Sequence, residues 1–206
     1  DTAPLLAQSY LLRDDKLWSE LQSKTLGWYQ QHPENSRALI SIAGNLISNE
    51  SMDAKKVAEE ILRAVIKNNP ENTQSLYSLA VLLGMTGRSD EAADIYRKLL
   101  SIEPENVVAI NNLAWILCEN QAQPQQALEL AQKGLKQAPD YIDLIDTRGM
   151  IYFRLGKFQE AVDDFSKCVE LYPESSPQSI ASRFHLAKAY AGLKNNLKAI
   201  SYLKDV

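Results

Sequence analysis

The chain has 206 residues, a net charge of −4 and an apolar content of 45%, with only 8 glycines and 8 prolines. This composition favours an ordered, helix-rich protein over a disordered one. Lysine and arginine form no cluster along one face, and no apolar run approaches the roughly 20 residues of a membrane span. Nucleic-acid binding and direct insertion into a membrane are therefore not expected.

The N-terminal residues 1–35 form the least regular unit of the sequence. Leucines within residues 5–12 predict a first helix, and further apolar residues predict a second helix that ends near Pro33. We interpret this stretch as a degenerate or capping unit.

The rest of the chain consists of units that are each expected to form two helices. The helical spacing of apolar residues and the positions of prolines place these units at 36–72, 73–106, 107–141, 142–175 and 180–206. Asp53 and Ser89 are expected to cap the second helices of their units. The last unit stops inside its second helix, so we expect either a piece of a longer array or an end that pairs with another copy.

Two small residues and a closing proline keep the same register in successive units. The prolines are Pro33, Pro70, Pro104, Pro139 and Pro173, and three of them open the triplet Pro-Glu-Asn. The small residue of the first helix recurs as Ala43, Ala80, Ala114, Gly149 and Ala187, and that of the second helix as Ala58, Ala92, Ala127, Ala161 and Ala199. This regularity indicates an array of helical hairpins of about 34 residues each.

At these residues the chain resembles the tetratricopeptide repeat (TPR) family. The resemblance implies an all-α fold, a right-handed superhelical solenoid of about six hairpins, with 1–206 as a single domain. One departure from the family pattern is Arg148, which replaces the usual leucine. Its aliphatic stem can cover apolar surface while its guanidinium reaches a carboxylate or water.

The resemblance also implies that the first helix of each unit lines a concave wall. Residues beside its packing positions are then candidates for binding a protein or peptide partner. They are Tyr77, Val81, Asn111, Asn112, Trp115, Asp143, Asp146, Met150, Phe153, Phe184, His185 and Lys188. We expect the aromatic residues to be the anchors and the asparagines to hold the amides of an extended peptide.

Two recognition patterns of the family are not matched by this sequence. The Lys/Asn/Arg clamp for a C-terminal carboxylate is present only as Asn112, because Tyr77, Val81, Asp143 and Thr147 stand at its other positions. The asparagine ladder of TPR glycosyltransferases requires repeated asparagines, and the sequence has one at that position.

The sequence offers little for catalysis or for a cofactor. Cys118 and Cys168 lack metal-ligand spacing and are expected to be buried thiols. His185 has no nucleophile or carboxylate at a suitable spacing in the sequence, and Asp143 with Asp146 is a poor cation site. These two carboxylates are better explained as an acidic patch that selects a basic partner. We expect no enzyme activity and no cofactor.

The resulting hypothesis is a non-catalytic scaffold that binds a partner peptide or helix in the concave groove. Two alternatives stay open: the interaction arm of a larger enzyme, such as a glycosyltransferase, and a scaffold that self-associates through its uncapped C-terminal end. Residues 107–175 are similar in style to bacterial envelope and secretion proteins of the family. The compartment, cytoplasmic or periplasmic and envelope-associated, stays open too.

Overall fold

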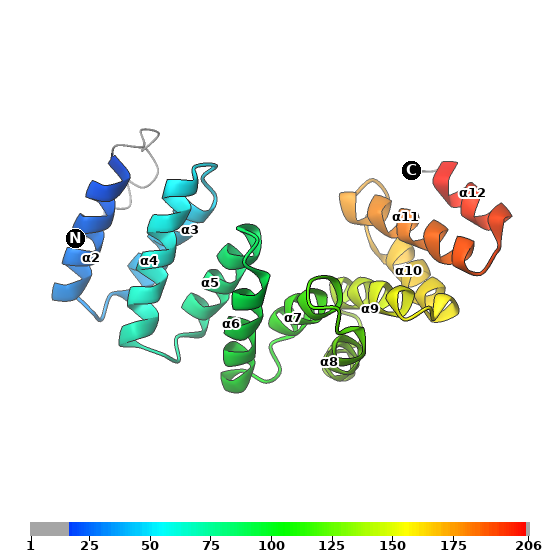
Figure 1. Ribbon diagram of the computed structural model, residues 1–206, viewed down its shortest axis with the longest axis horizontal. Coiled ribbons are helices and arrows are strands. Elements are labelled where there is room, and N and C mark those ends of the chain that lie inside the picture. The colour runs from blue at the N-terminus through cyan, green and yellow to red at the C-terminus, as the bar shows by residue number, and fades with distance from the viewer. Residues whose placement is uncertain (1–16, 205–206) are drawn as a thin grey trace. The chain divides into compact units, whose positions relative to one another are not determined.

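The computed structural model describes residues 17–204, which are helical and contain no strand (Figure 1). The predicted all-α class is confirmed. The predicted helix within residues 5–12 lies outside the described residues. The helices are α2 (Trp18–Gln31), α3 (Ser36–Ile47), α4 (Met52–Asn68), α5 (Thr73–Met85), α6 (Ser89–Ile102), α7 (Val107–Glu119), α8 (Pro124–Gln137), α9 (Ile142–Arg154), α10 (Phe158–Leu171), α11 (Pro177–Gly192) and α12 (Asn196–Lys204).

From α3 onward the helices pack as hairpins of neighbours in the sequence, α3 with α4 through to α11 with α12. The chain divides into two compact units, 1–104 and 105–206. In the first, α2 and α5 both pack against α4. In the second, α9 contacts both α7 and α11, so the first helices of three hairpins are neighbours. The prediction of a single domain over 1–206 stays a prediction.

The asparagine of the Pro-Glu-Asn triplet begins two of the first helices. Asn72 Oδ1 accepts a hydrogen bond from Ser75 N at 2.8 Å, and Asn106 Oδ1 accepts one from Ala109 N at 3.0 Å. Each bond satisfies one of the backbone donors that a helix leaves free at its N-terminus. Asn35 occupies the same place before α3 but makes no side-chain cap.

The two predicted caps of second helices were wrong. Helix α4 is capped by Ser51, whose hydroxyl accepts from the backbone N–H of Asp53, because the helix begins earlier than expected, at Met52. Helix α6 begins at Ser89 itself, and Arg88 occupies the cap position without a side-chain bond. Each helix therefore already includes the polar residue that was expected to precede it.

Glycine is needed at the turn of two hairpins. Gly87 and Gly156 have φ of 78° and 72°, in the left-handed region that costs other residues energy. Each closely follows a first helix and lets the chain reverse into the second one.

The small residues of the repeat register lie where helices meet. Ala43, Ala58, Ala80 and Ala161 have no exposed surface. A Cβ added to Gly149 would lie 2.7 Å from Phe165 Cε1, so only glycine lets α9 approach α10 this closely. The small residues that recur in the sequence are therefore the positions at which two helices pack closely.

Both cysteines are free and buried, as expected. Burial raises the pKa of Cys118 to about 12 and also raises the pKa of Cys168, so neither thiol is a reactive thiolate at neutral pH. Within residues 17–204, no helix has the length and apolar character needed to cross a membrane.

Candidate functional site

Ten of the predicted site residues lie on α7, α9 and α11 of the second unit. We call the surface formed by Asn111, Trp115, Asp143, Phe153, Phe184 and Lys188 the three-helix wall. The other two predicted residues, Tyr77 and Val81, lie on α5 in the first unit and are half-buried. The Tyr77 ring packs edge-on against Tyr96, with centroids 6.4 Å apart.

Two large aromatic side chains of the wall are open to solvent. Trp115 on α7 is 41% exposed and Phe184 on α11 is 44% exposed. Most side chains of this size lie in the core, and exposed aromatic groups on a structured surface are the groups that anchor partners at interfaces. Since α9 contacts both α7 and α11, the two aromatics stand on the helices that flank α9.

A lysine sits on the aromatic part of the wall. Lys188 Nζ lies 5.2 Å from the ring centroid of Phe153 and 5.5 Å from that of Phe184, within the range of cation–π attraction. No ion pair involves Lys188 among the described residues. The wall therefore presents an exposed positive charge that has no carboxylate paired with it.

Two predicted site residues are more buried than a binding surface requires. Met150 is 7% exposed and packs in the core cluster with Phe165 and Leu186. His185 is half-buried against the Phe165 ring, with centroids 5.3 Å apart, and its Nδ1 is buried without a hydrogen bond. Together with Phe153 and Lys188 they line a shallow depression that has no room for a water molecule.

Hydrogen bonds join the first helices below the wall. Thr147 Oγ1 donates to Asn111 Oδ1 at 2.7 Å, which links α9 to α7, and Ser182 Oγ donates to Asp146 Oδ1 at 2.7 Å, which links α11 to α9. Asn112 is half-buried beside them and has contacts of its own. These bonds fix the three helices in register, and they use the acceptor atom of Asn111 that a peptide amide would need.

Ser182, His185 and Asp146 are the residue types of a nucleophilic triad, but their arrangement differs from one. The Ser182 hydroxyl donates to the Asp146 carboxylate and is 1% exposed, so no substrate atom can reach it. Burial raises the pKa of Asp146 and lowers the pKa of His185, while their mutual attraction opposes both shifts. The group is a polar contact between α9 and α11.

The acidic end of the wall is Asp143, at the start of α9. Its Oδ1 accepts a hydrogen bond of 2.6 Å from the Tyr172 hydroxyl, and burial together with this bond raises the pKa of Tyr172. Asp143 is exposed, whereas Asp146 one turn further on is largely covered. The predicted acidic patch therefore offers one accessible carboxylate.

Sequence reasoning missed three side-chain pairs that join the first helices. Glu119 on α7 and Arg154 on α9 form a charge-assisted pair with a 2.8 Å bond from Arg154 Nε, and this bond lowers the pKa of Glu119. The spacing of 35 residues, one repeat, is the signal that could have found it. The same spacing of about one repeat joins Asn111 to Thr147 and Asp146 to Ser182.

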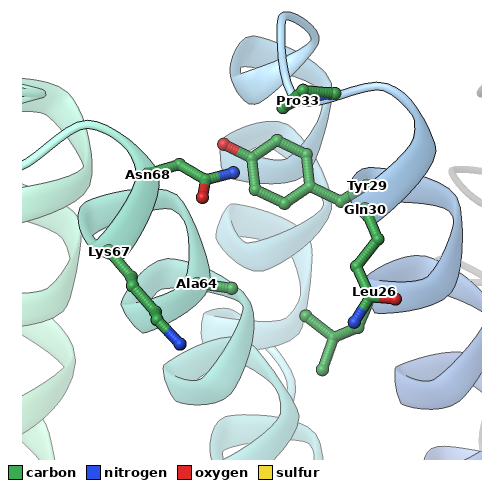
Figure 2. A pocket seen from close by; sticks show the side chains of 7 residues that line it. All are labelled: Leu26, Tyr29, Gln30, Pro33, Ala64, Lys67 and Asn68. Carbon is green, nitrogen blue, oxygen red and sulfur yellow. The ribbon is translucent and has the colours of Figure 1, made fainter.

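A separate pocket of about 410 Å³ lies between α2 and α4 in the first unit (Figure 2). Figure 2 shows the Tyr29 ring across the pocket, Ala64 on the α4 side and the amide of Asn68 near its upper end. Its lining residues are Leu26, Tyr29, Gln30, Pro33, Ala64, Lys67 and Asn68. The pocket is large enough for one apolar side chain of a partner or for a small molecule.

The structure offers no metal site in residues 17–204, since nowhere do three histidine, cysteine or acidic side chains come together. The exposed groups of the wall are suited to recognition, because a ligand can stack on the aromatic rings and pair with Lys188 or Asp143.

Comparison with family models finds the tetratricopeptide repeat three times. Different models of this repeat match residues 55–107, 85–145 and 147–175, which together cover most of the described hairpins.

Among curated proteins, the chain is 26% identical over 144 residues to the Pseudomonas aeruginosa protein named TPR repeat-containing protein PA4667, covering 70% of the chain and 24% of that protein. It is 32% identical over 107 residues to the uncharacterized protein y4yS of Sinorhizobium fredii, covering 52% of the chain and 50% of that protein. It also matches the human protein O-mannosyl-transferase TMTC3, 24% identical over 82% of the chain and 18% of the enzyme. The chain thus spans half or less of each of these relatives.

Among solved structures, a tetratricopeptide repeat protein from Parabacteroides merdae matches with a TM-score of 0.75 and 16% identity, over 100% of this chain and 78% of that one. The structure of YrrB, described as a TPR protein with an unusual peptide-binding site, matches with a TM-score of 0.67 and 19% identity, over 88% of this chain and 89% of that one. At these identities the likeness concerns the fold.

Proposed function

Because this chain belongs to the tetratricopeptide repeat family, we propose that it is a protein-interaction scaffold whose three-helix wall binds a peptide or helix of a partner protein. The observation that carries the proposal is the exposure of Trp115 and Phe184 on helices that are otherwise well packed. An ordered wall of this kind binds without first being folded, which lowers the entropic cost of association.

Other features of the wall support a role in recognition rather than catalysis. Lys188 and Asp143 provide opposite charges at its surface, and the polar residues beneath it are engaged in holding the helices. YrrB, a protein of the same fold, is described as having a peptide-binding site. We propose on this basis that the chain itself is non-catalytic.

The proposal is tested by partner capture with surface variants. A Trp115→Ala/Phe184→Ala variant removes both exposed anchors, and we expect it to lose a partner that the unmodified protein retains, because aromatic anchors each contribute about 2 kcal/mol or more at interfaces. A matched control, Met52→Ala/Leu171→Ala, removes two exposed apolar side chains that lie off the wall, 55% and 46% exposed.

A second control fills the pocket between α2 and α4. Ala64→Phe places a ring in the space shown in Figure 2 and should leave partner capture unchanged. Loss of the partner only in the Ala64→Phe variant would move the binding site to this pocket and contradict the proposal for the wall. Circular dichroism of each variant checks that the helices are retained.

An interaction arm of a larger enzyme is the second candidate function. It is favoured by the match to TMTC3, a named O-mannosyl-transferase of which this chain covers 18%. In that case the wall would still bind a protein or peptide, and the reaction would occur in a different domain. The full reading frame that encodes this chain distinguishes the scaffold from the interaction arm. A long segment without repeats in that frame would support the interaction arm of an enzyme.

We also propose self-association through α12 as an alternative use of the fold. Leu197, Ile200 and Leu203 are 86%, 52% and 48% exposed, whereas Val162 and Phe165, the equivalents of the last two in α10, are 4% and 0% exposed. Sedimentation or light scattering across concentrations tests this alternative. A constant monomer mass at tens of micromolar would exclude it.

A further inference from the structure

The wall carries its two accessible charges at opposite ends. Asp143 lies in the first turn of α9, and Phe153, on whose ring Lys188 rests, lies ten residues later near the end of the same helix. At 1.5 Å per residue, this separates the carboxylate and the ammonium by roughly 15 Å along the axis of α9.

The other charged groups near the wall are paired or largely covered. Arg154 is paired with Glu119 through a 2.8 Å bond, and Asp146 is covered and accepts from Ser182. No cation is paired with Asp143 and no carboxylate is paired with Lys188 among the described ion pairs. A ligand on the wall therefore meets one free negative charge and one free positive charge.

The exposed apolar side chains of the wall are aromatic. The Phe153 and Phe184 rings surround Lys188, and Trp115 is exposed on the helix at the other side of α9. An apolar side chain of a ligand would bury the most surface against these rings. Its contacts would also exclude water from Asp143 and Lys188, and an ion pair that the ligand forms with either residue is then stronger than in bulk water.

We propose that the three-helix wall selects an extended peptide segment with a basic residue at one end, an apolar residue in the middle and an acidic residue at the other end. The basic side chain pairs with Asp143, the apolar one packs on Trp115 or Phe184, and the acidic one pairs with Lys188. At about 3.3 Å per residue, an extended chain covers a span of roughly 15 Å in about four or five residues. This inference rests on the proposed function of the wall.

Synthetic peptides test the charge pattern directly. The probes are acetylated and amidated peptides of about six residues that share a central Leu-Phe pair and differ only at their ends: Lys with Glu in both orders, Lys with Lys, Glu with Glu, and Gln with Gln. We expect one order of the Lys/Glu peptide to bind about five-fold more tightly than the neutral peptide, as measured by NMR titration, since a solvent-accessible ion pair adds a modest gain.

Charge reversal on the protein makes the test specific. Lys188→Glu should shift the preference to the Lys/Lys peptide, and Asp143→Lys should shift it to the Glu/Glu peptide, because selectivity arises from repulsion as much as from attraction. Lys133→Glu and Glu129→Lys on the exposed side of α8 are the matched controls and should leave the preference unchanged.

The outcomes separate this inference from the proposed function. Equal binding of all five peptides that is lost in Trp115→Ala would overturn the charge pattern and leave the wall as the binding site. Binding that is unaffected by Trp115→Ala would overturn both. Failure of every peptide to bind at millimolar concentration, with partner capture still dependent on Trp115 and Phe184, would overturn the charge pattern alone.

Discussion

Gly149 shows at the scale of one residue how the repeat register determines packing. We predict that Gly149→Ala destabilises the protein by about 1–2 kcal/mol, because the added methyl group would lie 2.7 Å from Phe165, which is fully buried. Gly84→Ala in α5 is the control, since nothing lies within 4 Å of its added Cβ; it should stabilise by up to about 1 kcal/mol. Urea unfolding measures both, and equal effects would contradict this explanation of the packing.

His185 gives a prediction for pH. Burial lowers its pKa in the folded protein, against the pull of Asp146 and with a smaller contribution from Lys188, while Glu119 opposes the shift. The unfolded chain therefore binds the proton more readily, and stability present above a pH of about 6.5 is lost as the pH falls. We expect His185→Gln to reduce the fall in melting temperature between about pH 7 and pH 5.5, by on the order of 2 °C.

The contribution of Asp146 to stability changes with pH in the opposite direction, so Asp146 provides the control for that experiment. Burial raises its pKa, so its protonated form is favoured in the folded protein, and its contribution to stability decreases as the pH rises from about 4. Asp146→Asn should therefore change the acidic part of the profile below about pH 5.5. Because it also removes the attraction that raises the pKa of His185, it should deepen the loss of stability that His185 causes at falling pH. If Asp146→Asn abolishes the pH dependence above that value, the assignment to His185 is wrong.

The sequence predicted the residues that repeat and missed the side-chain pairs that join two helices. Ala161 and Gly149 could be found because each hairpin needs a small residue at the same place. The carboxylate that Arg148 reaches could not: it belongs to Asp164, whose side chain is 8% exposed. The pattern of apolar residues along one helix indicates which face of that helix is buried. The partner of a buried charge depends on how two helices cross, and the sequence of one helix does not contain this information.

The sequence also predicted some features of the candidate site and missed others. Trp115 and Phe184 were expected on the surface from their position beside the packing stripe, and both are exposed there. Met150 was expected beside them and packs in the core instead, because α9 is central among α7, α10 and α11 and has less free surface than its neighbours. The pocket between α2 and α4 has no local sequence signal, since it forms where the ends of two separate helices meet.

At the scale of elements, the Arg148–Asp164 pair joins α9 to α10 with bonds of 2.8 and 2.7 Å. Arg148→Leu restores the usual residue of the family, but we predict a loss of about 2 kcal/mol because the Asp164 carboxylate would stay buried without its partner. The Arg148→Leu/Asp164→Leu variant should lose less than the sum of the single changes, by about 1 kcal/mol or more. Additive losses in urea unfolding would show that the two side chains act independently.

At the scale of the whole chain there are two compact units, and within each of them the described hairpins pack against their neighbours in the sequence. The stability of such an array is approximately a sum over repeats and the interfaces between them. A defect in one hairpin should therefore lower local stability near it and have little effect several hairpins away. Hydrogen exchange followed by mass spectrometry measures this quantity helix by helix.

We predict that Gly149→Ala increases the exchange of α9 and α10 about ten-fold, as a loss of about 1.4 kcal/mol in local stability requires, and leaves α3 and α4 unchanged. Gly84→Ala, in the first unit, is the matched variant and should slow the exchange of α5 without altering α9. A uniform increase across all described helices of Gly149→Ala would mean that the array unfolds as one cooperative body. In that case binding at the three-helix wall would also stabilise α3 and α4, whereas independent hairpins would confine its effect to α7, α9, α11 and their partners.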